Sequence, residues 1–400
     1  MNTFKTGRRA AAAALAGLLA LGLAACGGGG GGGGDTASGG TGTLRLAMTD
    51  APACGFDTVN VTVEKVRVHQ SSTAADADGG WSEVVLNPAR RMDLLSLTNG
   101  VLSELGQVAL PAGRYTQLRL VLADNSNANP LANSVKPTGE AETALTTPSA
   151  QQSGLKMPVQ IDVAANQLAD FVLDFDACKS VVSAGNSGKY LLKPVISVIP
   201  RLVSGVSGRV DASLPMGSTM VSLQDGGVTV RATAPDAAGN FLLQPVPVGT
   251  YTFVMTAPGR TTLVVRGVPV TSGSVSTLGT STLVLAPAAS PVGTLAGTVT
   301  TASSPVDALT RALQSLSGGP VIELAARPVD SVAGTFRHEL PTAAPQVANW
   351  AGLVGVPVFA ADTGAAGQYS LQAVAGTAAK QAGPLTLAPG ATVTTTFVFP

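Results

Sequence analysis

Apolar and polar residues alternate with a period of two along most of this chain. Val59–His69 alternates almost throughout, and Val228–Ala232 alternates strictly. This pattern predicts strands that bury one face, and Gly- or Pro-rich turns separate such segments at short intervals. We therefore predict an all-β protein. The first half of the chain holds further predicted strands at Leu44–Met48, Trp81–Leu86, Met92–Leu95, Tyr115–Leu122, Lys156–Val163, Asp170–Phe175 and Tyr190–Ile199.

Three segments depart from the simple strand pattern. Val101–Leu105 lies between two glycines and predicts one or two helical turns. Asp124–Gln152 is polar and rich in Asn, Pro, Ser and Thr, so we predict a long excursion that is partly ordered at best. Asp307–Leu316 has leucines that suit a helix, but its similarity to the Val228 segment favours a strand.

Short sequence repeats divide the chain. Leu295-Ala-Gly-Thr-Val299 resembles Val206-Ser-Gly-Arg-Val210, and Ala366-Gly-Gln-Tyr369 resembles Ala238-Gly-Asn-Phe241, with Ala333-Gly-Thr-Phe336 as a possible further copy. The wider gap between the later signals predicts an insertion. The predicted organisation is a signal peptide (1–25), a lipidated Cys and tether (26–42), a first β domain (43–203), a β-sandwich (204–286), a linker (287–293) and a second sandwich with an insertion (294–400).

A Pro-x-Gly-x-Tyr pattern connects the first two domains. It occurs at Pro111–Tyr115 and again at Pro247–Tyr251. Pro presets the turn, Gly supplies a positive φ and Tyr begins the next strand. We therefore predict the same turn in both places.

The N-terminus has the features of an export signal. Basic residues precede an apolar Ala/Leu segment that ends in Leu23-Ala-Ala-Cys26. The ending resembles the lipobox of bacterial lipoproteins, which implies that the sulfur of Cys26 carries lipid after cleavage. The apolar segment is shorter than the roughly 20 residues of a membrane-spanning helix. The residue after Cys26 is Gly27 and not Asp. In similar lipoproteins this implies delivery to the outer membrane, where the protein would face the periplasm or the cell surface.

A run of glycines, Gly27–Gly34, follows the predicted lipid site. It cannot bury apolar surface, so it predicts a flexible tether. The remaining composition narrows the possible partners: the formal net charge is +0, and removal of the basic signal leaves a slight acidic excess. The chain has no cluster of basic residues that would bind nucleic acid. The predicted partners are the membrane, through the lipid, and a glycan or an envelope protein.

Two cysteines remain besides Cys26. In an exported chain, an even pair favours a disulfide between Cys54 and Cys178, with two buried thiols as the alternative.

Two resemblances to known families support this organisation. The second domain resembles the carboxypeptidase regulatory-like, or prealbumin-like, β-sandwiches, which are also grouped with starch-binding-like folds. The residues that carry this resemblance are Gly208-Arg-Val, Val228-Thr-Val, Gly239-Asn-Phe and Val246-Pro-Val-Gly-Thr-Tyr, and the third domain is similar. The first domain resembles an uncharacterised bacterial lipoprotein family, a domain of unknown function, through Met48–Pro52, Val61–Val66, Asp93-Leu-Leu, Gly113–Leu120, Asp174-Phe-Asp and Leu192-Lys-Pro-Val. Neither resemblance implies an activity.

Catalytic motifs are missing from the sequence. His69 ends a strand pattern and His338 lies in Phe-Arg-His-Glu-Leu, and a lone His in such a place is more often a surface residue than a base. No zinc motif, nucleophile elbow, phosphate loop or Cys-x-x-Cys pair occurs. We predict a protein that is not an enzyme and needs no cofactor.

Three carboxylates form a candidate metal site. A Cys54–Cys178 disulfide would bring Asp50 close to Asp174 and Asp176, which share one strand face. The three could bind a cation, or they could cap strand ends by accepting backbone N–H groups.

These observations predict a structural or interaction role for sandwiches held at a membrane. Carbohydrate binding is the first alternative, because the sandwich resembles starch-binding folds. Such sites usually present exposed aromatic rings to sugars, and the candidates here are Trp81, Trp350 and Tyr369. An enzyme is the second alternative, which the absence of a paired base and nucleophile disfavours.

Overall fold

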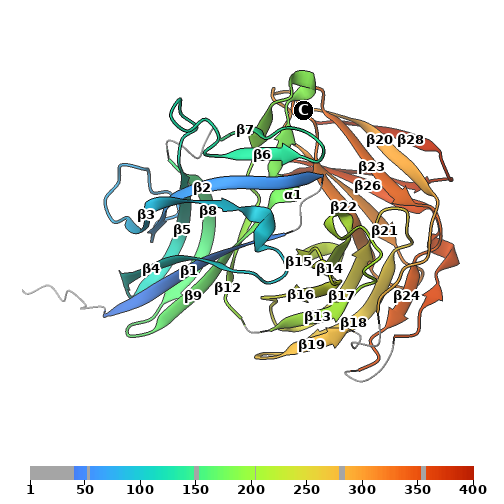
Figure 1. Cartoon of the computed structure of the whole chain (residues 1–400), viewed down its shortest axis with the longest axis horizontal. Coiled ribbons are helices and arrows are strands. Elements are labelled where there is room, and N and C mark those ends of the chain that lie inside the picture. The colour runs from blue at the N-terminus through green and yellow to red at the C-terminus, as the bar shows by residue number, and fades with distance from the viewer. Residues whose placement is uncertain (1–39, 52–54, 148–152, 203, 279–283, 353–356) are drawn as a thin grey trace, which may run out of the picture. The chain divides into compact units, whose positions relative to one another are not determined.

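The computed structural model describes residues 40–400, apart from 52–54, 148–152, 203, 279–283 and 353–356. The predicted signal peptide, Cys26, most of the tether, and Cys54 lie outside the described residues. Within them, nearly all regular structure is strand, which confirms the predicted all-β, tandem-sandwich fold. The strands form six sheets, two for each of three successive sandwiches (Figure 1).

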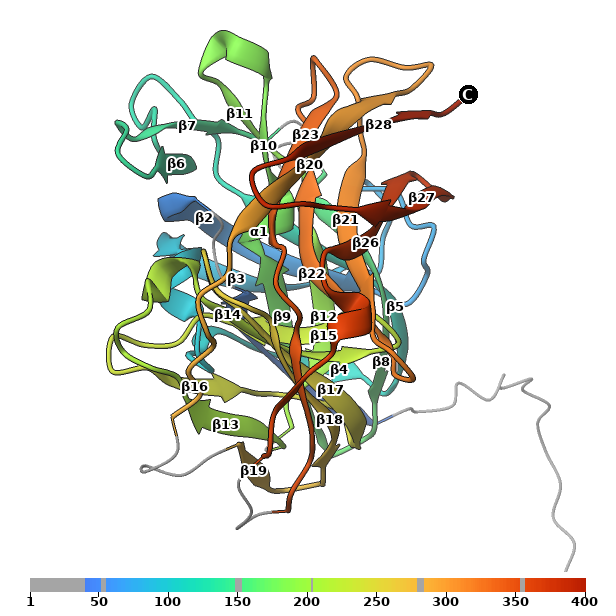
Figure 2. The same cartoon turned by 90° about the vertical axis from the view of Figure 1, so that its right-hand side faces the viewer.

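One sheet of each sandwich has the same three strands at its centre. The first strand of each sandwich lies at the centre of this sheet. It pairs antiparallel with the fourth strand that the three sandwiches share and parallel with the seventh, which is the last. These triplets are β1 (Thr41–Ala51), β4 (Ser103–Pro111) and β9 (Leu168–Asp176); β13 (Gly205–Arg209), β16 (Asn240–Leu243) and β19 (Val275–Leu278); and β20 (Val292–Thr300), β23 (Thr335–Pro341) and β28 (Thr392–Val398). Figure 2 shows β23, β20 and β28 running side by side.

The opposing sheets also correspond. We count only the strands that all three sandwiches share, which leaves out the strands found in only one of them. In each opposing sheet the second strand then pairs with the third and the fifth, and the fifth pairs with the sixth, all antiparallel. The members are β2 (Phe56–His69), β3 (Ser82–Asp93), β5 (Gly113–Leu122) and β8 (Leu155–Val163); β14 (Met220–Asp225), β15 (Val228–Thr233), β17 (Gly249–Thr256) and β18 (Leu263–Val270); and β21 (Leu309–Ser315), β22 (Val321–Pro328), β26 (Gln368–Ala375) and β27 (Ala378–Thr386). All three sandwiches therefore share one strand order, the first included.

The first sandwich carries additional elements. The segment predicted as a partly ordered excursion contains β6 (Ser134–Pro137) and β7 (Thr143–Thr146), which extend its larger sheet together with β10 (Val181–Ser183) and β11 (Tyr190–Leu192), while β12 (Ile196–Pro200) pairs with β9. Asn133 anchors the excursion, because its side chain accepts the Thr62 N–H at 3.0 Å and donates to the Ala123 carbonyl at 2.7 Å. Polar side chains thus satisfy backbone groups that a sheet leaves unpaired.

Helices are short in the described chain. They are the 3₁₀ turns η1 (Leu94–Leu97), η2 (Gly185–Ser187), η3 (Met216–Ser218) and η4 (Thr363–Ala365), and the single-turn helix α1 (Ala177–Ser180). The prediction of a helical turn at Val101–Leu105 is wrong, because β4 begins there. The helical turn is η1, just before this segment, and the Asp93 side chain caps it by accepting the Leu95 N–H at 3.2 Å. No helix in the described part is long and apolar enough to cross a bilayer.

The two Pro-x-Gly-x-Tyr turns form the same hydrogen bond, but the positive φ predicted for both glycines occurs at Gly113 and not at Gly249. The Tyr115 hydroxyl donates to the Pro111 carbonyl at 3.0 Å, and the Tyr251 hydroxyl donates to the Pro247 carbonyl at 2.9 Å. Each bond closes the turn between the fourth and fifth strands of its sandwich, as tyrosine corners do in other sandwiches.

The third sandwich contains the same turn in two pieces. The Tyr369 hydroxyl donates to the Pro341 carbonyl, although a long insertion separates the two residues in sequence. The insertion contains β24 (Gln346–Asn349) and β25 (Ala360–Ala361), and β24 pairs parallel with β18 of the second sandwich. The true counterpart of Ala238–Phe241 is therefore Ala333–Phe336, which begins β23, whereas Ala366–Tyr369 belongs to the split tyrosine turn.

We expect replacement of Tyr251 by Phe to lower the free energy of unfolding by about 1 kcal/mol, because one buried hydrogen bond and its turn closure are lost. Chemical denaturation of the purified variant measures this. Tyr190→Phe is the matched control, since no hydrogen bond of the Tyr190 hydroxyl occurs among the described residues; an equal loss in both variants would contradict the turn-closing role.

Candidate functional site

The acidic residues singled out in the sequence lie where the first sandwich meets its neighbours. β1 and β9 are parallel, and their register places Thr49 beside Asp174 and Asp50 beside Phe175. Asp176 ends β9 and is the N-cap residue of α1 (Ala177–Ser180). The three carboxylates therefore come from one end of two adjacent strands.

Groups of the protein itself bind these carboxylates. Asp50 accepts the Ala177 N–H at 3.0 Å, and Asp176 accepts the Lys179 N–H at 3.0 Å while pairing with its ammonium at 2.9 Å. Asp174 forms an ion pair with Arg231. The backbone-capping alternative thus describes Asp50 and Asp176. Among the described residues, no group of three or more His, Cys, Asp or Glu is arranged to hold a metal ion.

Arg231 is the residue that sequence reasoning missed. It extends from β15 of the second sandwich, its side chain is 0% exposed, and it donates to the Thr49 hydroxyl at 3.1 Å as well as pairing with Asp174. The strict alternation around it suggested an exposed polar face. In the structure that face is covered by the first and third sandwiches, while Val228 on the supposed apolar face is 57% exposed.

Burial controls the charge of this cluster. Desolvation raises the pKa of Asp50 well above its usual value, Asp176 adds to the rise, and the Ala177 N–H opposes it. Desolvation also raises the pKa of Asp174, against the stabilising charge of Arg231. The neutral form of Asp50 is therefore favoured over a wider pH range than in an exposed residue, and Arg231 has Asp174 as its main counter-ion.

Glu323 of β22 connects all three sandwiches. Its backbone N–H donates to the Gln224 side chain at 2.8 Å, and its carbonyl accepts from the same side chain at 2.7 Å. Its carboxylate accepts the Thr229 hydroxyl at 3.0 Å, pairs with Arg311, and lies 3.9 Å from the Lys179 ammonium. One acidic residue thus bonds to β14, β15, β21 and α1.

The sandwiches also share apolar cores. Val254 and Val264 of the second sandwich belong to the core of the third. In return, Ala348 of the third sandwich's insertion is buried in the core of the second, and Trp350 packs against it. This exchange buries side chains from both sides of the boundary.

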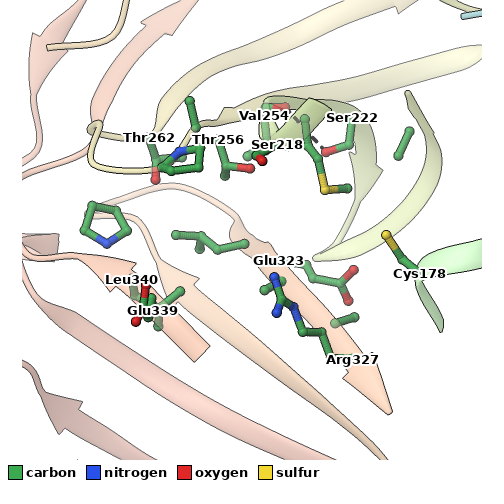
Figure 3. A pocket seen from close by; sticks show the side chains of 18 of the residues that line it. Cys178, Ser218, Ser222, Val254, Thr256, Thr262, Glu323, Arg327, Glu339 and Leu340 are labelled. Carbon is green, nitrogen blue, oxygen red and sulfur yellow. Dashed lines mark hydrogen bonds between the residues drawn. The ribbon is translucent and has the colours of Figure 1, made fainter. Parts of the chain in front are cut away.

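A cavity of about 530 Å³ opens beside Glu323. Figure 3 shows Ser218, Ser222, Val254, Thr256 and Thr262 of the second sandwich on one side, facing Glu323, Arg327, Glu339 and Leu340 of the third. Cys178 and Lys179 of α1 also line it. Cys178 is buried, and because Cys54 lies outside the described residues, the Cys54–Cys178 disulfide stays a prediction.

The aromatic residues predicted to stack on sugars are engaged elsewhere. The guanidinium groups of Arg67 and Arg119 each lie 4.6 Å from the centre of the Trp81 ring. Trp350 is partly buried against the second core, and Tyr369 is only 3% exposed. These placements bury Tyr369 and leave Trp81 and Trp350 partly exposed, so sugar binding at the two tryptophans stays a prediction.

The two histidines have different environments. His69 Nε2 lies 3.0 Å from the Gly79 carbonyl in a surface turn. His338 contradicts the surface prediction, since it is 2% exposed and its Nε2 lies 2.9 Å from the Thr310 hydroxyl in the third core. Burial and the charge of Arg327 lower the pKa of His338 to about 4.

We expect the His338 pKa to make the third sandwich acid-sensitive. The unfolded chain binds this proton with a pKa of about 6.5, above the folded value, so stability is lost as pH falls from about 6.5 towards 4. The full loss is about 3 kcal/mol. Urea unfolding at about pH 7 and pH 4.5 measures it, and His338→Gln should lose less stability than the wild type over that interval. Identical losses would contradict the assignment.

Comparison with known proteins supports the first domain's predicted resemblance. Residues 41–194 match a family described as Domain of unknown function (DUF4382). This match confirms the similarity to an uncharacterised family, while the lipoprotein character stays a prediction. No curated protein matched the chain.

Several solved structures share distant similarity. The Bacillus anthracis TIE protein is 12% identical over 90% of this chain, with a TM-score of 0.17, and the chain covers 50% of its length. A streptococcal ancillary pilin is 11% identical over 89% of this chain and 99% of its own, with a TM-score of 0.16. The minor pilin GBS52 of Streptococcus agalactiae is 13% identical over 52% of this chain and 88% of its own, with a TM-score of 0.15.

Proposed function

We propose that this chain is a non-catalytic protein of the cell envelope, anchored by lipid on Cys26, whose three sandwiches act as one rigid body in a structural or interaction role. The observation that carries the proposal is the burial of Arg231 against Asp174 and Thr49 of another sandwich. A charge buried at a boundary must keep its partner, because separation leaves both groups desolvated and unpaired. The shared core residues oppose separation in the same way.

The chain's two tryptophans provide a test of rigidity. Trp81 reports on the first sandwich, and Trp350 reports on the second, against which it packs. In the single-tryptophan variants Trp81→Phe and Trp350→Phe, we expect fluorescence to follow unfolding transitions with the same denaturant midpoint. Separate midpoints would show that the sandwiches unfold independently and would reject the rigid body.

Lipid attachment has its own experiment. The full chain and its Cys26→Ala variant are expressed in a Gram-negative bacterium with labelled palmitate, and membranes are separated from soluble protein. We expect label and membrane partition in the parent and neither in Cys26→Ala, while Cys54→Ala, the control cysteine variant, keeps both. If Cys26→Ala partitions with membranes as the parent does, the anchor is rejected. Protease treatment of intact cells then distinguishes surface display from a periplasmic orientation.

A further inference from the structure

The cavity beside Glu323 has the properties of a small-molecule site. Its volume of about 530 Å³ falls within the range of roughly 300–1,000 Å³ for ligand pockets. Its walls combine apolar side chains, such as Val254 and Leu340, with the hydroxyl groups of Ser222, Thr256 and Thr262. Such walls suit a molecule with an apolar body and few polar groups.

The charges around the cavity leave a basic excess. Each lining carboxylate has a basic partner: Asp176 with Lys179, Glu323 with Arg311, and Glu339 with Arg337. Within the described part of the chain, Arg260 and Arg327 have no carboxylate at ion-pair distance, although both line the cavity. The Arg260 guanidinium donates only to the Pro287 carbonyl, at 3.5 Å.

Arg327 is the guanidinium best placed to receive a ligand. It extends from β22 into the cavity, and no hydrogen bond of its side chain occurs in the described structure (Figure 3). Desolvation by the surrounding protein lowers its pKa, while the charge of Glu339 opposes this. A planar fork of donors without a partner among the described residues, on an exposed arginine that lines the cavity, matches a carboxylate in shape and charge.

We propose that this cavity binds a small organic acid, with its carboxylate on Arg327 and its apolar body against Val254 and Leu340. A singly charged carboxylate fits better than phosphate, because Arg327 offers one guanidinium that is unbonded within the described chain, whereas Arg260 already donates to the Pro287 carbonyl. This site goes beyond the proposed anchoring and structural role and does not depend on either.

Calorimetry on the purified full chain tests the site with hexanoate, hexanol and inorganic phosphate as probes. We expect hexanoate to bind at least about tenfold more tightly than hexanol or phosphate, and Arg327→Gln to weaken hexanoate binding by about tenfold or more. Arg90→Gln is the matched control: Arg90 is an exposed arginine of the first sandwich that has no carboxylate partner among the described residues, and its loss should change nothing.

A second variant tests the cavity itself. Ala326→Phe fills space beside Arg327 while keeping the guanidinium, and it should also abolish hexanoate binding. Unfolding midpoints near that of the parent show that each variant is folded. The proposal is overturned if hexanoate fails to bind at about 10 mM, if phosphate binds as tightly, if Arg90→Gln weakens binding equally, or if folded Ala326→Phe binds as the parent does.

Discussion

Replacing Arg231 by Met is expected to lower the free energy of unfolding by about 3–5 kcal/mol, because Asp174 is left buried without its counter-ion. Met keeps an unbranched apolar chain in place of the arginine stem, so the loss reports mainly on the missing guanidinium. Urea unfolding near neutral pH measures the effect. Arg114→Met is the control, since Arg114 and Asp162 form an exposed pair, 59% and 66% exposed, in which we expect little change.

A second substitution separates the charge from the contact. Adding Asp174→Asn to Arg231→Met removes the stranded carboxylate, so the double variant should recover much of the loss. If the double variant is as unstable as the sum of its single changes, the ion pair is not the source of the effect. An Arg231→Met variant with unchanged stability would also remove the main support for a rigid three-sandwich body.

Local sequence patterns were sufficient to predict much of this fold. Alternation in segments such as Val59–His69 predicts strands because a half-buried strand needs one apolar face. The Pro-x-Gly-x-Tyr turn is also local, since the tyrosine hydroxyl and its acceptor are four residues apart in Pro111–Tyr115 and Pro247–Tyr251. The third copy escaped prediction because an insertion separates Pro341 from Tyr369, and only the folded chain reunites them.

The candidate site depends on contacts that no local pattern contains. The neighbourhood of Asp50, Asp174 and Asp176 was predicted from the proposed Cys54–Cys178 disulfide, yet Arg231, the counter-ion of Asp174, comes from another sandwich. Whether a polar strand face meets water or a neighbouring sandwich depends on how the sandwiches pack. The same reason explains the aromatic residues: residue type makes Tyr369 a candidate for sugar stacking, but only packing shows that it is buried.

Gly297→Ala is expected to destabilise the third sandwich by about 1–3 kcal/mol or more, because the strand has no room for a methyl group. A Cβ there would lie 1.7 Å from the Thr395 carbonyl oxygen and 2.9 Å from the Phe336 ring. Gly297 pairs with both residues, one on each neighbouring strand. Relief requires a shift of backbone in the central strand of the sheet.

Gly208 of the second sandwich has the same environment. Its Cβ would lie 2.4 Å from the Leu278 carbonyl oxygen and 2.5 Å from the Phe241 ring, so Gly208→Ala should show a similar loss. The sequences around the two glycines, Ser-Gly-Arg-Val and Ala-Gly-Thr-Val, are similar for a physical reason. In each, an aromatic ring from the adjacent strand covers the glycine. Gly217→Ala is the control, since nothing lies within 4 Å of its added Cβ. Thermal and urea unfolding compare the three variants, and a Gly297→Ala protein as stable as Gly217→Ala would show that the ring and carbonyl can move aside without cost.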